Sequence, residues 1–442
     1  MKVHKTLRVA LVGCGTVGGA TAEILLHERK HLMERSGIDI ELTAIISKTY
    51  RHARELGLPE DLFTTDLDTV LADPELDVVI ELTGGIDFPL ELIKKALDAG
   101  KNVVTANKAL LAYHGAELFA YARSRGLTIG FEASSAGGIP IIRALTDGLI
   151  ANHIDAIYGI VNGTCNYILT EMIDKGQSYA EALAEAQASG LAEADPSLDV
   201  QGGDSAHKLA IMTSLAFGTK VDFDAIPVSG IDNLDSRDVA YGLQLGYVVK
   251  LLAVAYRLNG GVTTWVRPAF IANEHPLARV SGPFNAVSVY GHRTGHTLYY
   301  GRGAGGDPTA SAVVADLVAL ATGTLPATFH TTGFWPDLNT GPPQISSTQT
   351  SSRYYLRIMV QDRPGVMARI ASILGDNNIS IASLIQNEKA RKNELIPVVI
   401  TTHVCQEEAL QKSLTAIDAL PQCGEKSVFI PIVDEHPERW TR

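Results

Sequence analysis

The sequence predicts an α/β protein in three parts: a Rossmann-like doubly wound parallel sheet, a mixed α/β domain and a carboxy-terminal ferredoxin-like module. Two observations predict the first part: strand and helix patterns alternate, and a glycine loop follows the first strand. A βαββαβ order at the other end predicts the last part. We place the parts at residues 1–132, 133–308 and 353–442 of the 442-residue chain.

The amino-terminal alternation consists of short apolar runs separated by segments with helical spacing. Strands are predicted at Leu7–Val12, Ile40–Ile46, Val78–Leu82, Asn102–Thr105 and Leu127–Glu132, and helices at Val17–Glu34, Pro89–Ala99 and Ala116–Ser124. Because parallel strands need crossover helices, we expect helices on both faces of this sheet.

The middle of the chain is richer in glycine turns and mixes helices with strands. Helices are predicted at Tyr179–Ser189, Ser205–Ala216 and Thr309–Ala321, and strands at Leu251–Tyr256, Thr263–Val266 and Ala286–Tyr290. We expect the helical segment 309–335 to pack back onto the first domain.

A polar Pro/Ser/Thr stretch, residues 339–352, is typical of a linker. The module after it has the order strand, helix, strand, strand, helix, strand, at Tyr354–Val360, Gly365–Gly375, Ile379–Gln386, Ile396–His403, Gln406–Ala419 and Lys426–Ile432. We therefore expect an independent ferredoxin-like unit.

Composition excludes several classes of partner. The net charge is -12 and no Lys/Arg block is present, so neither nucleic acid nor an anionic membrane is an expected partner. No apolar stretch approaches the roughly 20 residues of a membrane span, and the first residues are polar. The four cysteines are far apart, so we expect neither a disulfide nor zinc. These features predict a soluble cytoplasmic protein that binds small molecules.

The glycine loop Gly13-Cys14-Gly15-Thr16-Val17-Gly18 is the first motif that carries chemistry. Gly13 permits the tight turn, Gly15 lets the backbone approach a pyrophosphate, and Gly18 lets helix and strand pack closely. Such a motif also arises by chance in a chain with 40 glycines. Its place between a strand and a helix favours dinucleotide binding, with Thr16 and Val17 at the helix start, over a plain turn.

The cofactor is NADP or NAD. An NAD site usually has an acidic residue at the end of the second strand, whereas this chain has Ser47 and Lys48 there, with Arg51 close behind. A hydroxyl and two cations suit a 2'-phosphate and favour NADP. The alternative, that Lys48 and Arg51 are ordinary surface charges, stays open.

Two further segments fall at predicted strand ends, where open α/β sheets bind ligands. Thr83 and Gly84 follow one strand, and Lys108 follows the next in the run Thr105-Ala106-Asn107-Lys108. We expect Lys108 to reach the substrate or the nicotinamide; a solvated lysine is the alternative.

The acidic run from Gly190 to Lys208 is the most specific motif. Asp204 and Lys208 are four residues apart, so they share one face of a helix that begins near Asp204. The alternatives are an Asp204 that caps this helix and an exposed ion pair of little energetic value.

Taken together, the motifs resemble those of homoserine dehydrogenase. They are GCGTVG near the start, ANKAL from Ala106, NGTCNYIL from Asn162 and the acidic run that ends at Lys208. The tail, with Gln361-Asp362-Arg363-Pro364-Gly365-Val366 and Asn378-Ile379-Ser380, resembles an ACT domain, a module that binds amino acids. The length resembles the bacterial monofunctional type.

The resemblance implies reversible NAD(P)-dependent reduction of L-aspartate 4-semialdehyde to L-homoserine, in threonine and methionine biosynthesis. It implies Lys208 as proton donor, and Glu193, Asp199 and Asp204 as carboxylates for substrate. The other implied roles are Lys108 at the cofactor and substrate junction, Gly163 and Thr164 in the substrate pocket, Gly305 near the nicotinamide, and a monovalent cation, such as sodium, at Glu132 and the carbonyls of Ser135, Gly137 and Ile139.

Physical chemistry is consistent with these roles, because an ammonium can stabilise and protonate the oxygen that gains charge when an aldehyde is reduced. Leu191 and Cys165 depart from the family, where an aromatic residue and a threonine are usual, so the shape of the pocket differs in detail.

Two alternatives remain: another reductase of the aspartate pathway, or a non-catalytic sensor of nucleotide and amino acid. For the leading hypothesis we expect feedback by threonine at the ACT domain and a homodimer or homotetramer. We also expect that removal of the chain after Ser352 keeps catalysis and abolishes inhibition.

Overall fold

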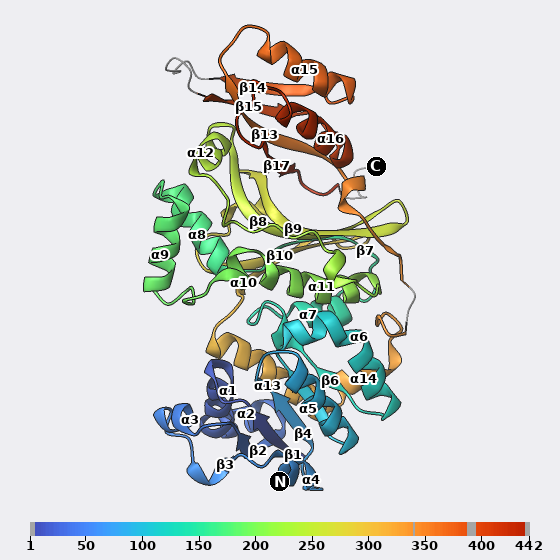
Figure 1. Ribbon diagram of the computed structural model, residues 1–442. Coiled ribbons are helices and arrows are strands. Elements are labelled where there is room, and N and C mark those ends of the chain that lie inside the picture. The colour runs from blue at the N-terminus through green and yellow to red at the C-terminus, as the bar shows by residue number, and fades with distance from the viewer. Residues whose placement is uncertain (1–4, 339–340, 387–394, 438–442) are drawn as a thin grey trace. The chain divides into compact units, whose positions relative to one another are not determined.

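The computed structural model describes residues 5–338, 341–386 and 395–437 (Figure 1). Residues 339 and 340 of the predicted linker, and the ends of the chain, lie outside the described residues. The chain divides into two compact units, each assembled from separate segments. The first is Met1–Gly163, Asp204–Asp224 and Phe284–Pro343, and the second is Thr164–Gly203, Ala225–Pro283 and Gln344–Arg442.

The first unit contains a six-stranded parallel sheet in the order β3-β2-β1-β4-β5-β6. Its strands are β1 (Lys5–Val12), β2 (Ile38–Ile46), β3 (Phe63–Thr64), β4 (Val78–Glu81), β5 (Asn102–Thr105) and β6 (Ile129–Gly130). The connecting helices are α1 (Thr16–His27), α2 (Arg29–Ser36), α3 (Arg51–Glu55), α4 (Leu67–Ala72), α5 (Asp87–Asp98) and α6 (Lys108–Ser124). The predicted doubly wound parallel sheet is confirmed.

Two helices differ from the prediction. The helix expected over 17–34 is two helices that meet at Glu28, because the backbone there leaves the helical conformation. Helix α6 begins at Lys108, well before the expected start, since the side chain of Asn107 accepts a hydrogen bond from the N–H of Leu110 and caps the helix. The sequence pattern did not reveal this cap, which fixes the position of Lys108.

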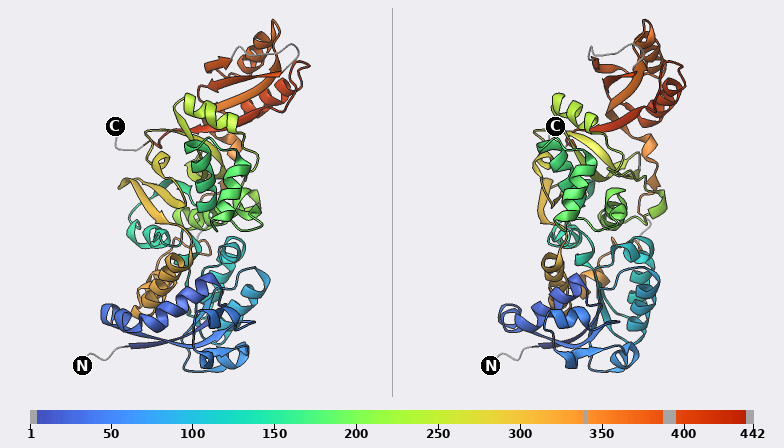
Figure 2. Two further views of the ribbon diagram at one scale, coloured as in Figure 1. Left: turned by 90° about the vertical axis from the view of Figure 1, so that its left-hand side faces the viewer. Right: turned by 60° about the vertical axis from the view of Figure 1, so that its left-hand side comes forward.

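In the rest of the first unit, strand β10 lies between β7 and β11 and pairs antiparallel with both. The elements of this part are α7 (Ile141–Arg143), β7 (Ile154–Ile160), α11 (Gly203–Phe217), β10 (Phe284–Gly291), β11 (Gly295–Arg302), α13 (Gly306–Thr322) and α14 (Thr324–Thr331). Helix α13 packs along α1, and its Val313 and Leu317 share a core with Leu11 and Leu25 (Figure 2).

Among the described residues, no single helix is both long and apolar enough to cross a bilayer. Helices α13 and α14 reach that length only together, across an 80° bend.

The second unit begins with helices and a long hairpin. These elements are α8 (Gly163–Asp174), α9 (Tyr179–Ala188), α10 (Ser197–Val200), α12 (Ser236–Gln244), β8 (Tyr247–Leu258) and β9 (Gly261–Ala272). Strands β8 and β9 pair antiparallel over their whole length. The turn between them uses Asn259 and Gly260, both with positive φ, as a tight hairpin requires.

The carboxy-terminal module of this unit has the predicted βαββαβ order. Its elements are β13 (Ser351–Gln361), α15 (Val366–Asp376), β14 (Ile381–Gln386), β15 (Leu395–Thr402), the short β16 (Cys405–Gln406), α16 (Glu407–Asp418) and β17 (Val428–Val433). The sheet order β17-β13-β15-β14 is antiparallel, and both helices cover one face (Figure 1). Leu356 and Ile358 point into the core beneath the helices.

The other face of β13 turns toward α12. Arg357 donates to Asp238 with Nε at 2.6 Å from Oδ1 and Nη2 at 3.0 Å from Oδ2, and Tyr355 donates to the same carboxylate at 2.7 Å. All three side chains are buried. Tyr355 and Arg357 alternate with the core residues of the same strand, so both faces of β13 are buried.

The predicted linker is partly ordered. Strand β12 (Gln344–Ile345) pairs with β9, and a 3₁₀ turn spans Ser347–Gln349. Strand β17 pairs in parallel with the same β9, through Ile432 opposite Phe270. Backbone pairing of two residues leaves no pattern in side chains, and for this reason the sequence indicated only a polar connection.

Candidate active site

The glycine loop lies between β1 and α1. A Cβ on Gly13 would lie 2.6 Å from the carbonyl oxygen of Leu82, and one on Gly18 would lie 2.0 Å from that of Gly13. By contrast, no protein atom lies within 4 Å of a Cβ built on Gly15. Packing therefore explains the first and last glycines, whereas the open side of Gly15 suits the close approach of a pyrophosphate.

A second helix start lies beside this loop. Gly305, with φ of 121°, precedes α13, and a Cβ on Gly306 would lie 3.3 Å from the carbonyl oxygen of Thr16 and 3.4 Å from Cβ of Ala20. Neither α1 nor α13 has a side-chain cap at its first turn. The fold thus brings Gly305 to the glycine loop, and two helix amino termini lie where a dinucleotide's anionic groups would be held.

The residues expected to select the cofactor follow β2. Lys48 and Arg51 are exposed, and Ser47 is partly buried. Nε of Arg51 lies 3.2 Å from Glu55, in an exposed pair that contributes little energy and can exchange for a ligand phosphate.

At the ends of β4 and β5, buried Glu81 organises the loop that contains Thr83 and Gly84. Oε1 of Glu81 accepts from the backbone N–H and the hydroxyl of Thr83, at 2.8 and 2.7 Å, and Oε2 accepts from Thr105 at 2.6 Å. Asn107 donates to the carbonyl of Gly85 at 2.8 Å. These bonds fix the loop at the strand ends where ligands bind.

The centre of the site is Asp204, in the first turn of α11 and 2% exposed. Its Oδ1 lies 2.6 Å from Nζ of Lys108, and its Oδ2 lies 2.8 Å from Nζ of Lys208. Oδ2 also accepts from Asn162 at 2.8 Å, and Lys208 donates to the carbonyl of Val161 at 2.6 Å. The exposed-pair alternative is therefore wrong, and Asp204 does not cap the helix, which begins at Gly203.

Electrostatics hold this carboxylate charged. Burial alone would raise the pKa of Asp204, but the ammonium groups of Lys208 and Lys108 outweigh burial and hold the pKa well below its ordinary value. One anion thus faces two cations, so the cluster carries a net positive charge that suits an oxygen gaining negative charge.

The residues implied for the substrate lie in the second unit, apart from Gly163 at the start of α8. Oγ1 of Thr164 lies 2.9 Å from the carbonyl oxygen of Leu191 and 3.2 Å from Oδ2 of Asp199, and the buried thiol of Cys165 donates to the carbonyl of Asp199 at 3.2 Å. Both departures from the family pattern therefore take part in the hydrogen bonds of this segment, Leu191 through its carbonyl oxygen and Cys165 through its thiol. Glu193 is exposed in the same segment.

The loop implied to hold a cation is buried at Glu132, Ser135 and Ile139. Both carboxylate oxygens of Glu132 accept backbone N–H groups, from Ile142 and Arg143, each at 2.9 Å, so this side chain caps α7. Burial, with Asp316 nearby, raises the pKa of Glu132 to about 7. The described residues contain no cluster of three or more His, Cys, Asp or Glu suited to a metal.

The same loop shows two features of a binding segment. Ala136 has φ of 54°, a costly conformation for a residue with a side chain. The hydroxyls of Ser134 and Ser135 are buried, with no hydrogen-bond partner found for either. Glu132 and Gly137 also line a cavity of about 220 Å³.

Comparison with known proteins identifies the family. Residues 13–132 match the homoserine dehydrogenase NAD-binding domain, 140–318 match the homoserine dehydrogenase family and 354–422 match the ACT domain. A homoserine dehydrogenase of Pseudomonas aeruginosa is 44% identical over 420 residues, which cover 94% of this chain and 96% of that protein. The chain belongs to the homoserine dehydrogenase family. It is therefore an NAD(P)-dependent oxidoreductase with a carboxy-terminal ACT domain.

Solved structures agree with this family. A homoserine dehydrogenase from Thiobacillus denitrificans superposes with a TM-score of 0.91 at 42% identity, covering 97% of this chain and 99% of that chain. A hyperthermophilic archaeal homoserine dehydrogenase in complex with NADPH gives a TM-score of 0.59 at 27% identity, over 72% of this chain and 98% of that chain.

Two groups at the site were not predicted from the sequence. Asn162 and the carbonyl of Val161 follow β7, and both contact the Asp204 cluster. Their position after a strand was the available signal. His207 is also buried beside the cluster and stacks on Phe223, and burial lowers its pKa, so it is neutral near pH 7.

Proposed function

We propose that this homoserine dehydrogenase family member catalyses the reversible NAD(P)-dependent reduction of L-aspartate 4-semialdehyde to L-homoserine. The observation that carries the proposal is the buried Asp204 between the ammonium groups of Lys108 and Lys208. Burying a carboxylate and two ammonium groups costs desolvation free energy. Proton transfer to a carbonyl oxygen is a role that would explain why the protein retains this arrangement.

Lys208 would hold the proton at Nζ and donate it to the substrate oxygen as the aldehyde is reduced; in the reverse direction, Nζ would accept it from the hydroxyl. Asp204, with the carbonyl of Val161, orients that Nζ. Lys108 would stabilise the developing oxyanion. Glu193 would pair with the substrate ammonium, and Asp199 would orient Thr164 against the substrate.

When bound, the nicotinamide cofactor supplies the hydride for reduction and accepts it in the reverse reaction. The glycine loop, with Thr16, Val17 and Gly305, would hold its phosphates. Lys48 and Arg51 are exposed where a 2'-phosphate would lie, and this supports NADP as the preferred cofactor.

The experiment that tests the reaction uses the full chain with L-homoserine and either NADP⁺ or NAD⁺. We expect formation of reduced cofactor with both, and a lower KM for NADP⁺. Lys48→Ala with Arg51→Ala should raise the KM for NADP⁺ and leave that for NAD⁺ unchanged. Absence of reduced cofactor with either nucleotide would refute the proposed reaction.

A monovalent cation such as sodium would bind the carbonyls of Ser135, Gly137 and Ile139, with Glu132 completing the site. The strained Ala136 and the buried serine hydroxyls of this loop support the proposal. A higher melting temperature in sodium chloride than in an equal concentration of choline chloride would support it, and equal values would contradict it.

The regulatory proposal is that threonine or a related amino acid binds at the ACT domain and inhibits the enzyme, as expected for an early step toward threonine and methionine. The enzyme would act in the cytoplasm. Exposed Leu298 and Tyr300 on β11, and Leu384 on the edge strand β14, support association into a homodimer or homotetramer.

A further inference from the structure

The loop that follows β4, residues 83–85, lies directly against the glycine loop. A Cβ built on Gly13 would lie 2.6 Å from the carbonyl oxygen of Leu82 and 3.0 Å from Cγ2 of Thr83. Strands β1 and β4 are adjacent, and the chain extends the sheet in opposite directions from them. A dinucleotide binds across such a switch point, so a bound cofactor would contact both loops.

Two consecutive glycines give this β4 loop a backbone that packing does not hold. Gly84 has φ of 77° and Gly85 has φ of 79°. Apart from chain neighbours, no atom lies within 4 Å of a Cβ built on either residue. Thr83 and both glycines are exposed. Since glycine restricts the backbone least, the position of the loop depends on the hydrogen bonds at its two ends.

Buried side chains hold both ends of the β4 loop. At the first end, Glu81 accepts from the N–H and the hydroxyl of Thr83. At the second end, Nδ2 of Asn107 donates to the carbonyl of Gly85 at 2.8 Å. The hydroxyl of Thr105 joins these two side chains, because it donates to Glu81 at 2.6 Å and accepts from the N–H of Asn107 at 2.9 Å. The three side chains form one buried network.

The side chain of Asn107 also fixes the start of the helix that carries Lys108. Its Oδ1 accepts from the N–H of Leu110 at 3.1 Å and caps α6. Lys108 is the first residue of α6, and its Nζ lies 2.6 Å from Asp204. One amide thus contacts the β4 loop through its nitrogen and the start of α6 through its oxygen.

We propose that Asn107 is a positioning residue that links a cofactor bound at the β4 loop to the placement of Lys108 against Asp204. A cofactor in contact with the loop would hold the carbonyl of Gly85 in place, and the amide of Asn107 would carry this order to α6. A substrate that meets an already ordered Lys108 loses less conformational entropy on binding. The catalytic half of this proposal rests on the proposed homoserine dehydrogenase reaction.

Two substitutions separate the two hydrogen bonds of Asn107. Asn107→Ser keeps a hydroxyl that caps α6, but this single, shorter group cannot also reach Gly85. Asn107→Asp keeps the capping oxygen and replaces the donor by an oxygen that repels the carbonyl of Gly85. Both variants should therefore keep the helix and lose the link to the β4 loop.

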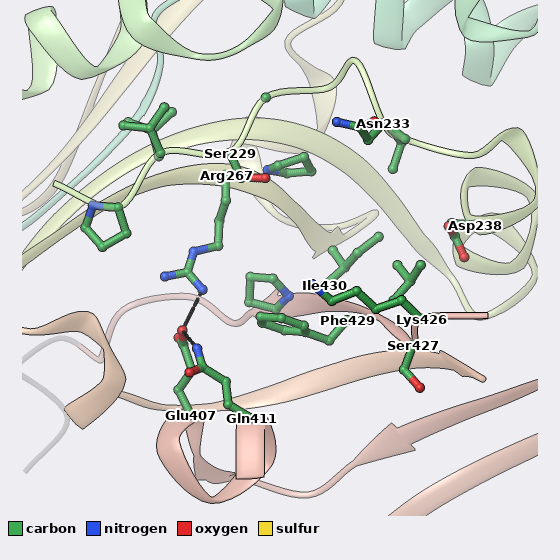
Figure 3. A pocket seen from close by; sticks show the side chains of 18 residues that line it. Ser229, Asn233, Asp238, Arg267, Glu407, Gln411, Lys426, Ser427, Phe429 and Ile430 are labelled. Carbon is green, nitrogen blue, oxygen red and sulfur yellow. Dashed lines mark hydrogen bonds and ion pairs between the residues drawn. The ribbon is translucent and has the colours of Figure 1, made fainter. Parts of the chain in front are cut away.

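A matched control comes from the second unit, where the amide of Gln411 donates to buried Glu407 at 2.9 Å. Figure 3 shows these two side chains, with Arg267 reaching Glu407 from β9, at a cavity of about 470 Å³. Gln411→Ser removes one amide donor from a buried carboxylate, as Asn107→Ser removes one from the β4 loop. The carboxylate of Glu407 is not an active-site group, so this control measures the effect of a lost amide hydrogen bond alone.

The test is labelling of lysine amines in the full-length protein with a limiting amount of an acetylating reagent, with and without saturating NADPH. Mass spectrometry gives the labelling rate of Lys108 relative to that of exposed Lys220 in the same molecule. An ammonium held against a carboxylate reacts slowly, because it rarely loses its proton. Bound NADPH that merely covers Lys108 would slow labelling equally in every variant, so the comparison of variants isolates the effect of Asn107.

We expect saturating NADPH to slow the labelling of Lys108 roughly tenfold in the unaltered protein and in Gln411→Ser, and less than about threefold in both Asn107 variants. The affinity for L-homoserine should follow the same pattern, measured by calorimetry without cofactor and in the non-reacting complex with NADPH. Asn107→Ser should keep a melting temperature near that of the unaltered protein, because its helix cap remains.

Equal slowing in the unaltered protein and in Asn107→Ser would overturn the proposal, and so would labelling of Lys108 that NADPH does not slow in the unaltered protein. A lower melting temperature of Asn107→Ser with the slowing intact would assign Asn107 a purely structural role. If the labelling of Lys108 follows the expected pattern but L-homoserine is neither bound nor oxidised, the link is supported and only the proposed reaction is refuted.

Discussion

Asp204 places one negative charge between two lysine ammonium groups at a position that is 2% exposed. Its two oxygens are divided between the lysines, so its loss would release both cations at once. Because Lys108 and Lys208 come from separate helices, this carboxylate also joins the start of α6 to the start of α11.

Asp204→Asn tests this positioning role. We expect kcat/KM for homoserine to fall by roughly a hundredfold or more, because a displaced proton carrier loses its alignment with the substrate. The pH at which aldehyde reduction is half-maximal should also shift to lower values, since an ammonium without its anion loses its proton more readily. The pH profile of initial rates measures this shift; a lower rate with an unshifted profile would assign Asp204 a purely structural role.

At this scale the sequence predicted part of the site. The spacing of Asp204 and Lys208 predicted a shared helix face, and the place of Lys108 after a predicted strand end, together with the resemblance, made it a candidate. Neither could predict that Asn162 and the carbonyl of Val161 contact the buried pair, because both lie more than forty positions earlier in the chain.

Among the elements, α8 is held by an unusual contact. Lys250, on β8 and 2% exposed, donates to Oδ1 of Asn166 at 3.2 Å and to the carbonyl of Val280 at 2.6 Å. Asn166 in turn donates to the carbonyls of Val280 and Gly282. The start of α8, with Thr164, is thereby fixed to the turn that precedes β10.

Burial lowers the pKa of Lys250 to about 8, although Asp174 partly opposes the shift. Between that value and 10.5, the ordinary lysine value, the unfolded chain binds more protons than the folded one, so this group makes stability rise with pH. Below about pH 8 the folded protein bears the full cost of the buried charge, about 3 kcal/mol from the size of the shift.

Lys250→Met should remove this rise. As the pH increases from 7 to 10, we expect the unfolding free energy of the unaltered protein to rise relative to that of the variant. Urea denaturation at both pH values measures it, with exposed Lys220→Met as the matched control. An unchanged difference would show that Lys250 does not titrate in this range.

At the scale of elements, the strand and helix order followed from periodicity, but the strength of the carboxy-terminal attachment did not. The pairing of β12 and β17 with β9 is made by backbone groups, and Asp238 contacts Arg357 across more than a hundred residues. The polar stretch therefore indicated only a linker, whereas residues 344–345 pair with β9 and 347–349 form a 3₁₀ turn.

For the whole molecule, this attachment changes the expected result of truncation. Removal of the chain after Ser352 would take away β17, one of the strands that pair with β9. It would also remove Tyr355, which packs on Phe270, and leave Asp238 and Arg267 without their ion partners. We now expect a less stable protein, not a fully active enzyme that has lost only its inhibition.

We expect the melting temperature of the truncated chain to fall by roughly 10 °C or more, because several buried interactions are lost together. Differential scanning calorimetry of both forms measures the fall. A truncated chain with the full melting temperature and full turnover would show that the ACT domain is only loosely attached.

We propose that Lys208, held by Asp204, carries the proton in homoserine dehydrogenation. The most direct test is turnover of Lys208→Ala with homoserine and NADP⁺, with NADPH binding measured by fluorescence and exposed Lys220→Ala as control. We predict that Lys208→Ala loses turnover by several orders of magnitude while it binds NADPH normally, and that the control retains full activity. A Lys208→Ala enzyme with a near-normal rate would contradict the account.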